Sequence, residues 1–255
     1  MLKVYAHPAS QPSRTIIWAC VLQDLPIELH ADPAAVNEVS PRGQLPVIED
    51  EGFVLTEMPA ILVYLADKYG WTDLYPEDLQ ARGRINQYLH AHHTLTRLAT
   101  TKLMAPHVLV AFGGNPGTNP LSYLNNTSIQ STWDEEDGVA KAQELVGEVI
   151  QHLEDYYLGE NDFIASAEQA SLADLACYEE IGQLVRANLL DFSERSKTNA
   201  WIERMEQLPH FAELHRFNQA LGDVKTTAND MDRFMAAIEA AMVELEGIDC
   251  VTLLR

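Results

Sequence analysis

Apolar and polar positions over residues 1–70 alternate between two periods. Short β-rich runs predict four strands, at residues 2–6, 27–30, 45–48 and 53–56. Helical spacing of apolar residues predicts two helices, over 12–24 and 57–69, of which the first begins with Pro12. Because the segment between the second and third strands reads as irregular, the order is βαβ, irregular segment, ββα. This order predicts a small α/β unit with a mixed four-stranded sheet.

Strand patterns almost vanish after residue 76. Apolar residues keep near-helical spacing from Leu79 to Leu103, and amphipathic runs follow at about 137–157, 172–187, 198–206 and 211–221. A last apolar stripe runs from Met231 to Leu245. The breaker-rich residues 113–120 predict a long surface loop.

These patterns predict two domains. We expect an α/β domain over residues 1–70, a linker at 71–76 and an all-α domain over 77–255, which ends in a helical extension. The extension after Thr227 is either a lid over a site or a packed amphipathic helix.

Charge and cysteine content narrow the classes of function. The 255 residues include 17 Lys and Arg against 38 Asp and Glu, a formal net charge of −21, which argues against nucleic acid and anionic membrane as partners. Three cysteines lie far apart and form neither a disulfide framework nor a zinc spacing. With no apolar leader and no apolar run near the ~20 residues of a spanning helix, the sequence predicts a cytoplasmic protein.

Candidate chemistry lies where strands and helices meet. Ser10-Gln11-Pro12-Ser13-Arg14 joins the first strand to the first helix. A hydroxyl at a helix N-terminus, where N–H groups are free and the dipole is positive, can help to hold an anion such as a thiolate. The alternative is that Ser10 or Ser13 only caps the helix, which is the commoner use of serine there.

Two further junctions could bind an extended ligand. In Gln44-Leu45-Pro46-Val47, a proline at a strand start leaves the preceding backbone groups free to pair with such a ligand, or simply marks an edge strand. In Leu55-Thr56-Glu57-Met58, a strand-to-helix junction places a carboxylate beside free backbone donors, where it could hold an ammonium group. The alternative for Glu57 is a glutamate favoured by the helix dipole.

Together these segments resemble a known family. The sequence SQPSR, then GQLPVIED, LTEMPAILVYLADKY and YPEDLQARGRINQYL, is similar to the cytosolic glutathione transferases, and to their theta class in particular. Ser171-Leu172-Ala173-Asp174 resembles the family's N-capping box, in which the serine caps a helix and the aspartate returns a bond to its start.

The resemblance implies a thioredoxin-like first domain that binds glutathione, and a helical second domain that supplies a pocket for an electrophile. Ser10 matches the catalytic serine that donates a hydrogen bond to the glutathione sulfur, and Tyr5 is its rival, although its place in the strand favours core packing. We expect Gln11 and Arg42 to contact glutathione as well.

The other junctions carry the remaining glutathione contacts in this resemblance. Gln44 matches the side chain that reaches the glycyl end, and Leu45 the residue whose backbone pairs with the cysteinyl part, before a cis Pro46. Glu57 matches the acid that holds the γ-glutamyl ammonium. Met58 stands where a serine or threonine usually binds the γ-glutamyl carboxylate, so we expect weaker glutathione binding than is usual, since a hydroxyl bond to a charged group contributes about 1.5–3 kcal/mol.

Two residues of the helical domain match positions near the electrophile. Thr94 occupies the place where some relatives offer an aspartate across a dimer interface, and Arg97 matches an arginine that faces the site. His90 and His93 share a helix face but lack a third ligand, so we expect no metal.

The expected function is therefore that of a homodimeric, cytoplasmic glutathione transferase. It would conjugate the thiolate to small hydrophobic electrophiles, with glutathione as co-substrate and no other cofactor, and reduction of organic hydroperoxides is a further activity that the resemblance allows. One alternative is a non-catalytic module of this fold that binds ligands or proteins, which Met58 makes conceivable. A disulfide or dehydroascorbate reductase is disfavoured, because Ser10 and Ser13 stand where a catalytic cysteine is wanted.

Overall fold

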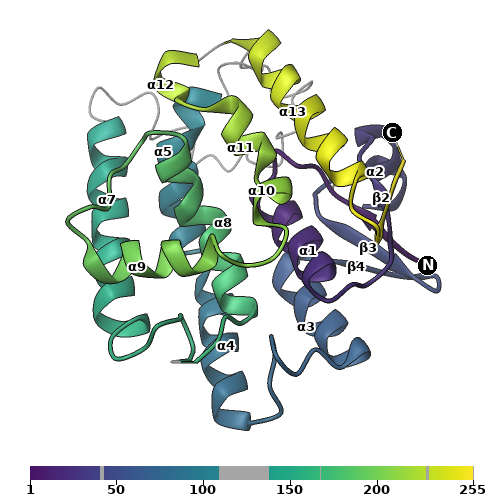
Figure 1. Cartoon of the computed structure of the whole chain (residues 1–255), viewed down its shortest axis with the longest axis horizontal. Coiled ribbons are helices and arrows are strands. Elements are labelled where there is room, and N and C mark those ends of the chain that lie inside the picture. The colour runs from purple at the N-terminus through teal and green to yellow at the C-terminus, as the bar shows by residue number, and fades with distance from the viewer. Residues whose placement is uncertain (41–42, 109–137, 167, 228–229, 255) are drawn as a thin grey trace.

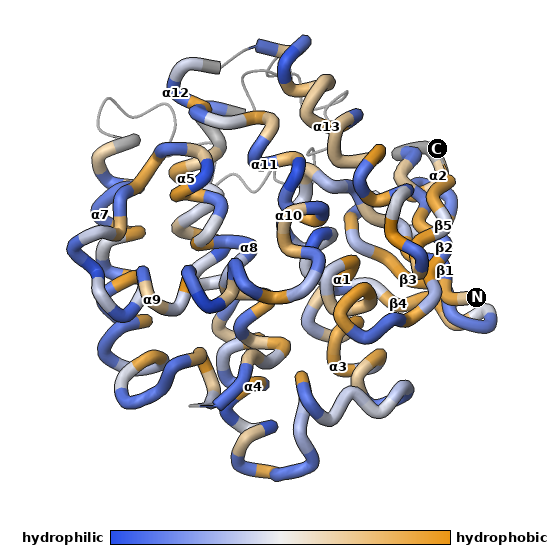
Figure 2. The backbone as a smooth tube through the Cα atoms, viewed as in Figure 1, coloured by the Kyte–Doolittle hydropathy of each residue, from blue (hydrophilic) through white to orange (hydrophobic). Residues whose placement is uncertain are grey.

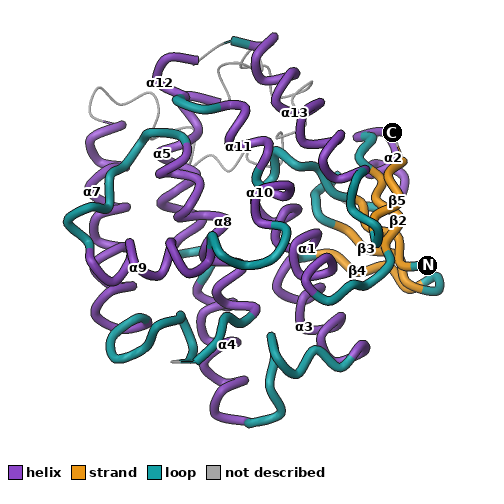
Figure 3. The backbone as a smooth tube through the Cα atoms, viewed as in Figure 1, coloured by secondary structure: helices purple, strands orange, loops and turns teal. Residues whose placement is uncertain are grey.

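The computed structural model describes residues 1–40, 43–108, 138–166, 168–227 and 230–254. The loop expected at residues 113–120 and Arg42 lie outside these ranges. The strands gather on one side of the molecule and most of the helices on the other (Figure 3). No helix in the described part of the chain is both long and apolar enough to cross a membrane.

The α/β part is built on a mixed sheet with the strand order β4-β3-β1-β2-β5. The four predicted strands are present as β1 (Leu2–Tyr5), β2 (Ile27–His30), β3 (Val47–Asp50) and β4 (Phe53–Thr56). Strand β1 runs parallel to β2 and antiparallel to β3, and β3 runs antiparallel to β4. The thioredoxin-like arrangement is therefore confirmed.

A fifth strand corrects the expectation of four strands and an all-helical remainder. Strand β5 (Val251–Leu254) comes from the far end of the sequence and pairs in parallel with β2. The Ile27 N–H donates to the Cys250 carbonyl at 2.9 Å, and the Ala31 N–H donates to the Leu254 carbonyl at 3.2 Å. The edge of β2 is thus covered, so the helical extension is anchored to the α/β part.

Three helices accompany the sheet, on two faces. Helices α1 (Gln11–Leu22) and α3 (Met58–Tyr69) lie between the sheet and the remaining helices (Figure 1). Helix α2 (Pro33–Val39) was not predicted; it packs through Val36 against Tyr5 and Val47 in a small separate cluster. Since successive side chains of a strand point to opposite faces, Val4 belongs to the main core and Tyr5 to this cluster.

The remaining helices form a bundle with one largely buried helix at its centre. The stretch predicted from Leu79 to Leu103 is two helices that meet at a turn, and residues 211–221 are likewise divided at His215. The bounds are α4 (Leu79–Ala91), α5 (Thr96–Val108), α7 (Gly138–His152), the π-helix η3 (Leu153–Tyr157), α8 (Leu172–Arg186), α9 (Ser196–Met205), α10 (Phe211–Leu214), α11 (Arg216–Leu221), α12 (Val224–Thr227) and α13 (Met231–Glu246).

Helix α8 is the centre of this bundle, and every residue from its first to Leu184 is buried. The predicted box at its start is confirmed. The Asp174 carboxylate accepts from the Ser171 N–H at 2.9 Å and the Ser171 hydroxyl at 2.8 Å, and also from the Ile164 N–H at 2.7 Å and Trp201 Nε1 at 3.0 Å. Apolar residues concentrate in the strands and in parts of α1 and α3, as Figure 2 shows.

Candidate active site

Three of the predicted segments meet at one end of the sheet. Tyr5, the last residue of β1, pairs with Val47, the first of β3, and Val47 pairs with Thr56, the last of β4. The chain after β1, before β3 and after β4 therefore starts from the same end of three neighbouring strands. The register thus makes neighbours of the segments that carry Ser10, Leu45 and Glu57.

Ser10 is the N-cap residue of α1, with an extended backbone (φ −94°, ψ 123°), but its side chain forms no capping bond. Its N–H donates to the His7 carbonyl at 2.9 Å. The residue is 4% exposed, and among the described residues its Oγ has no hydrogen-bond partner. By contrast, Asp78 and Asp230 cap their helices with side-chain bonds. The capping alternative for Ser10 is therefore not what the structure shows: a buried hydroxyl lies free at the positive end of a helix dipole.

The rival residue, Tyr5, is already engaged elsewhere. Its ring packs with Val36 and Val47 on the α2 face of the sheet, and its hydroxyl donates to Glu49 Oε2 at 3.3 Å. Burial, together with the charge of Glu49, raises the pKa of the tyrosine. Tyr5 thus takes the core position that its place in the strand favoured.

The segment before β3 has the expected backbone form. The Leu45–Pro46 peptide bond is cis, as predicted. Gln44 is held by its N–H, which donates to Ser40 Oγ at 2.8 Å. Leu45 precedes the first paired residue of β3, Val47, so its N–H and C=O take no part in the ladder with β1. An extended ligand could use these two groups as a strand would.

Glu57 and Met58 form the junction between β4 and α3. Glu57 has a positive φ of 72°, a conformation that costs a non-glycine residue on the order of 1–3 kcal/mol. Its side chain is 56% exposed and lies 3.6 Å, Oε2 to Nε2, from His93. Met58 is the first residue of α3, where a backbone N–H has no intrahelical acceptor, while its side chain is 3% exposed and belongs to the main core.

Thr94 and Arg97 differ in their exposure and in their contacts. Thr94 is an exposed residue of the turn between α4 and α5, and its hydroxyl donates to the Ala91 carbonyl at 3.2 Å. Arg97 Nη1 donates to Glu180 Oε1 at 2.8 Å, and its side chain is 13% exposed. The charge that was expected to face a ligand is therefore held by a buried carboxylate of α8.

Glu180 is one of two buried glutamates that the sequence reasoning did not single out. Besides Arg97, it accepts from the Thr100 hydroxyl and lies 3.4 Å from His92 Nε2. Burial raises the pKa of Glu180, but the charge of Arg97 and the contact with His92 outweigh it and lower the pKa to about 2. The sequence does contain a clue, because Glu179 and Glu180 interrupt an otherwise apolar helical stretch.

His93 is a second residue that was not assigned to the site. It is half-exposed and lies beside Glu57. Burial and the neighbouring His92 lower its pKa, so the imidazole is mostly neutral at pH 7. A neutral His93 leaves the charge of Glu57 available to a cationic ligand group.

Comparison with known proteins places this site in a family. Residues 4–74 match the family model described as "Glutathione S-transferase, N-terminal domain". Human glutathione S-transferase theta-2B is 31% identical over 214 residues, which cover 80% of this chain and 80% of that protein. The chain belongs to the glutathione S-transferase family. Human glutathione S-transferase theta-1 is similarly 32% identical over 215 residues, covering 80% of this chain and 82% of the relative.

Solved theta-class structures extend the similarity to nearly the whole fold. Human glutathione transferase theta-2, in complex with glutathione and an unknown ligand, superimposes with a TM-score of 0.75 at 26% identity, covering 94% of this chain and 98% of that one. The apo form of human glutathione S-transferase T1-1 has a TM-score of 0.73 at 27% identity, with 94% and 99% covered. The chain is thus a glutathione S-transferase with theta-class relatives.

The chemical problem of a glutathione S-transferase is the ionisation of a thiol. A cysteine-like thiol has a pKa of about 8.5, so only a few per cent is ionised at pH 7. Ser10 offers a hydroxyl with no competing acceptor, and α1 offers the positive end of its dipole. A hydroxyl donor and the positive end of a helix can each stabilise a nearby thiolate. The described residues include no group of three or more side chains that could bind a metal ion.

Proposed function

We propose that this glutathione S-transferase conjugates the thiolate of glutathione to small hydrophobic electrophiles, with Ser10 as the catalytic residue. The observation that carries the proposal is the buried, unpartnered Ser10 hydroxyl at the N-terminus of α1. Burying a hydroxyl without a partner is unfavourable, so the arrangement favours a ligand that accepts its hydrogen bond.

Two contributions would lower the pKa of the glutathione thiol. A hydrogen bond to a charged sulfur and the helix N-terminus together contribute roughly 2–3 kcal/mol. At 1.36 kcal/mol per unit, this lowers the pKa of the thiol by about one to two units. The thiol then reacts as thiolate near pH 7, and Ser10 itself forms no covalent bond.

The remaining contacts with the tripeptide are proposed from the segments around Ser10. The Leu45 backbone before Pro46 would pair with the cysteinyl part, Gln44 would reach the glycyl end, and Glu57 would hold the γ-glutamyl ammonium. The Met58 N–H, at the first position of α3, would meet the γ-glutamyl carboxylate. We propose further contacts from Gln11 and from Arg42, which lies outside the described residues.

Glutathione binding is assigned to residues 1–70 and the electrophile pocket to the helical part, near Thr94 and Arg97. We propose a homodimer, supported by the half-exposed apolar residues Phe53 and Val54 on the edge strand β4. A cytoplasmic location is supported by the free thiols of all three cysteines.

The test compares Ser10→Ala with Ser13→Ala. Ser13 is a matched control, because its Oγ is also buried and without a partner among the described residues, but it lies one turn further into α1. Glutathione affinity is measured first, and then the pH dependence of kcat/KM with an aryl halide electrophile. We expect Ser10→Ala, which removes the hydrogen bond but keeps the end of α1, to raise the pKa of the bound thiol by about one unit, and Ser13→Ala to leave it unchanged.

Three outcomes would change the proposal. Full turnover in Ser10→Ala would remove Ser10 from its role, and the same assay on Tyr5→Phe and Ser13→Ala would then test its rivals. Glutathione binding without turnover in the wild type would support the non-catalytic module. Turnover of a hydroperoxide, measured as glutathione oxidised to its disulfide, would add the peroxidase activity, in which two thiols are oxidised and the peroxide is reduced to an alcohol and water.

A further inference from the structure

A buried chain of polar contacts leads from the bundle to the loop that carries Ser10. Arg14, in the second turn of α1, contacts Glu179 of α8 through Nε and Oε2 at 2.6 Å. The second oxygen, Oε1, lies 3.0 Å from Nε2 of His215, the residue between α10 and α11. All three side chains are at most 2% exposed.

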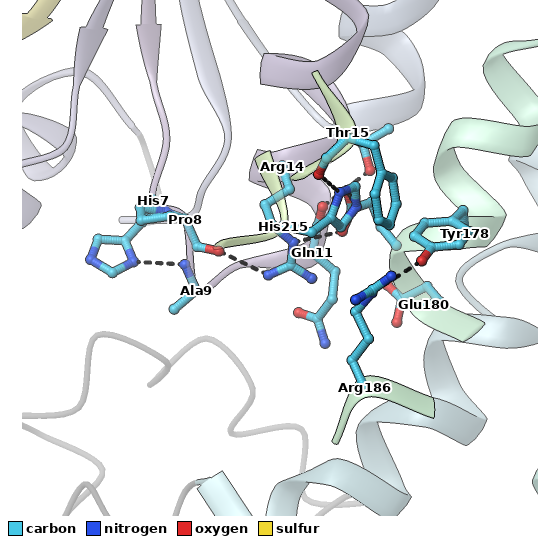
Figure 4. Close-up of polar contacts among 12 residues, drawn as sticks. His7, Pro8, Ala9, Gln11, Arg14, Thr15, Tyr178, Glu180, Arg186 and His215 are labelled. Carbon is cyan, nitrogen blue, oxygen red and sulfur yellow. Dashed lines mark hydrogen bonds and ion pairs between the residues drawn. The ribbon is translucent and has the colours of Figure 1, made fainter. Parts of the chain in front are cut away.

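The other end of this chain reaches the Ser10 loop directly. Arg14 Nη1 donates to the Pro8 carbonyl at 2.8 Å, and Figure 4 shows the guanidinium reaching that carbonyl with His215 beside it. Pro8 lies two residues before Ser10. Among the described residues, the other hydrogen bonds of residues 7–10 are local: the Ser10 N–H donates to the His7 carbonyl, the Ala9 N–H to His7 Nδ1, and the Arg14 N–H to the Ser10 carbonyl. Arg14 therefore ties the loop to the rest of the protein.

The guanidinium needs its partner to stay in this orientation. Its planar fork donates in fixed directions, so the bond from Nε to Glu179 sets the direction in which Nη1 points. Glu179 is ionised for a clear reason: burial raises its pKa, but the charge of Arg14 and the contact with His215 outweigh burial and lower it. His215 is fixed in turn by Nδ1, which lies 2.8 Å from the Phe211 carbonyl.

Stability alone is a weak explanation for this chain of contacts. Desolvation of a buried ion pair offsets most of its attraction, and a well-packed apolar replacement is often as stable or more so. An aromatic cluster already packs this region, since the His215 ring stacks on Phe211 with centroids 4.1 Å apart and meets Trp18 edge-on at 4.9 Å. The polar chain offers what apolar packing does not, a directed bond to the Pro8 carbonyl.

We infer that Glu179 and His215 are positioning residues for thiol activation, acting through Arg14 and the Pro8 carbonyl on the Ser10 hydroxyl. The inference rests on the proposed role of Ser10. Without Glu179, the Arg14 fork reorients, the Pro8 carbonyl loses its donor and the hydroxyl moves away from the sulfur. These polar contacts do not include the Leu45 and Glu57 segments, so we expect the affinity for glutathione to change much less than the pKa of its thiol.

The test is Glu179→Gln, which keeps the shape of the side chain and removes its charge. The pKa of the bound thiol is read from the ultraviolet absorbance of the thiolate and from the pH profile of kcat/KM. We expect a rise of about half or more of that in Ser10→Ala, with a dissociation constant for glutathione within about threefold of the wild type.

Glu180→Gln is the matched control. Glu180 is the adjacent residue and is equally buried at 1%. Its polar partners among the described residues, Arg97, His92 and Thr100, lie outside the Ser10 loop. We expect both variants to lower the melting temperature and only Glu179→Gln to raise the pKa of the thiol. If Glu179 had a purely structural role, both variants would change the pKa of the thiol alike. That result, or an unchanged thiol pKa in Glu179→Gln, would overturn the inference.

Arg14→Lys serves if Glu179→Gln does not fold. It keeps a positive charge beside Glu179 but replaces the fork by one compact ammonium, so the thiol pKa should still rise; an unchanged value overturns the inference. Ser10→Ala is measured in parallel. If Ser10→Ala leaves the thiol pKa unchanged, the proposed function of Ser10 fails; if only the Ser10 variant raises it, the positioning role alone fails.

Discussion

Met58→Ser should lower the free energy of unfolding of the protein and strengthen its binding of glutathione. Met58 is 3% exposed and packs in the main core, so shortening it removes buried apolar contacts. Methionine-to-alanine changes in cores cost about 2–5 kcal/mol, and we expect the free variant to lose stability in this range. The new hydroxyl, however, lies at the first residue of α3, beside the backbone donors proposed to meet the γ-glutamyl carboxylate.

The gain on binding follows from the charge of that carboxylate. A hydrogen bond to a charged group contributes about 1.5–3 kcal/mol, and each 1.4 kcal/mol is tenfold in affinity. Glutathione should therefore bind about ten- to a hundredfold more tightly to Met58→Ser than to Met58→Ala, which has the same core loss without the hydroxyl. The comparison of serine with alanine isolates the hydroxyl from the cavity.

Calorimetric titration with glutathione measures the affinity of both variants, and thermal unfolding with and without glutathione measures their stability. The two variants should unfold at similar temperatures without glutathione. Adding glutathione should raise the melting temperature of the serine variant more than that of the alanine variant. Equal dissociation constants for serine and alanine would refute the reasoning, because the hydroxyl would then not reach the ligand.

Three further predictions concern the fold around the site. Ending the chain after Ile248 removes β5 and with it the buried Val251, so unfolding in urea should show a loss of about 2–4 kcal/mol; an unchanged midpoint would mean that β5 adds nothing to the sheet. Asp174→Ala leaves four donor groups without their acceptor and should cost at least about 3 kcal/mol, while Ser171→Ala, which removes one of them, should cost less. Burial and Arg14 lower the pKa of His7 to about 4 from 6.5, so between these pH values the unfolded chain binds a proton that the folded chain does not, and stability falls as the pH drops. His7→Gln should flatten this fall in denaturation curves at pH 7 and pH 5, and equal slopes in both proteins would contradict it.

Local patterns predicted most of the α/β part. The period of apolar residues found α1, α3 and the strands to within a few residues, because those segments bury one face against an adjacent element. Helix α2 was missed, since Pro33–Val39 has only 7 residues, about two helical turns, which is too short to show a helical period. Strand β5 was missed for a different reason: Val251 pairs with Ile27, and nothing near either residue indicates a partner so far away in the sequence.

The site itself could be predicted only in part. Ser10, Leu45 and Glu57 were singled out from their junctions, but only the strand register brings them to one end of the sheet. The choice between a capping and a free hydroxyl at Ser10 depends on a side-chain direction that the sequence does not contain. Arg97 was placed near the electrophile by the family resemblance, and nothing local in the sequence indicates its pairing with Glu180, which lies 83 residues away.

The two buried glutamates change how an acidic protein can bind an anionic tripeptide. With a formal net charge of −21, the protein repels glutathione at long range, so a local source of positive potential is needed. The arginines of α1 and α5 do not supply a full charge, since Arg14 faces Glu179 and Arg97 faces Glu180. Among the residues that the structure describes, the positive ends of α1 and α3 remain near the site, and their free N–H groups are directed and cannot be neutralised by a mobile side chain. Glutathione recognition in this chain would then depend on backbone geometry more than on side-chain charge, which is the reason that the contacts holding the Ser10 loop in place matter.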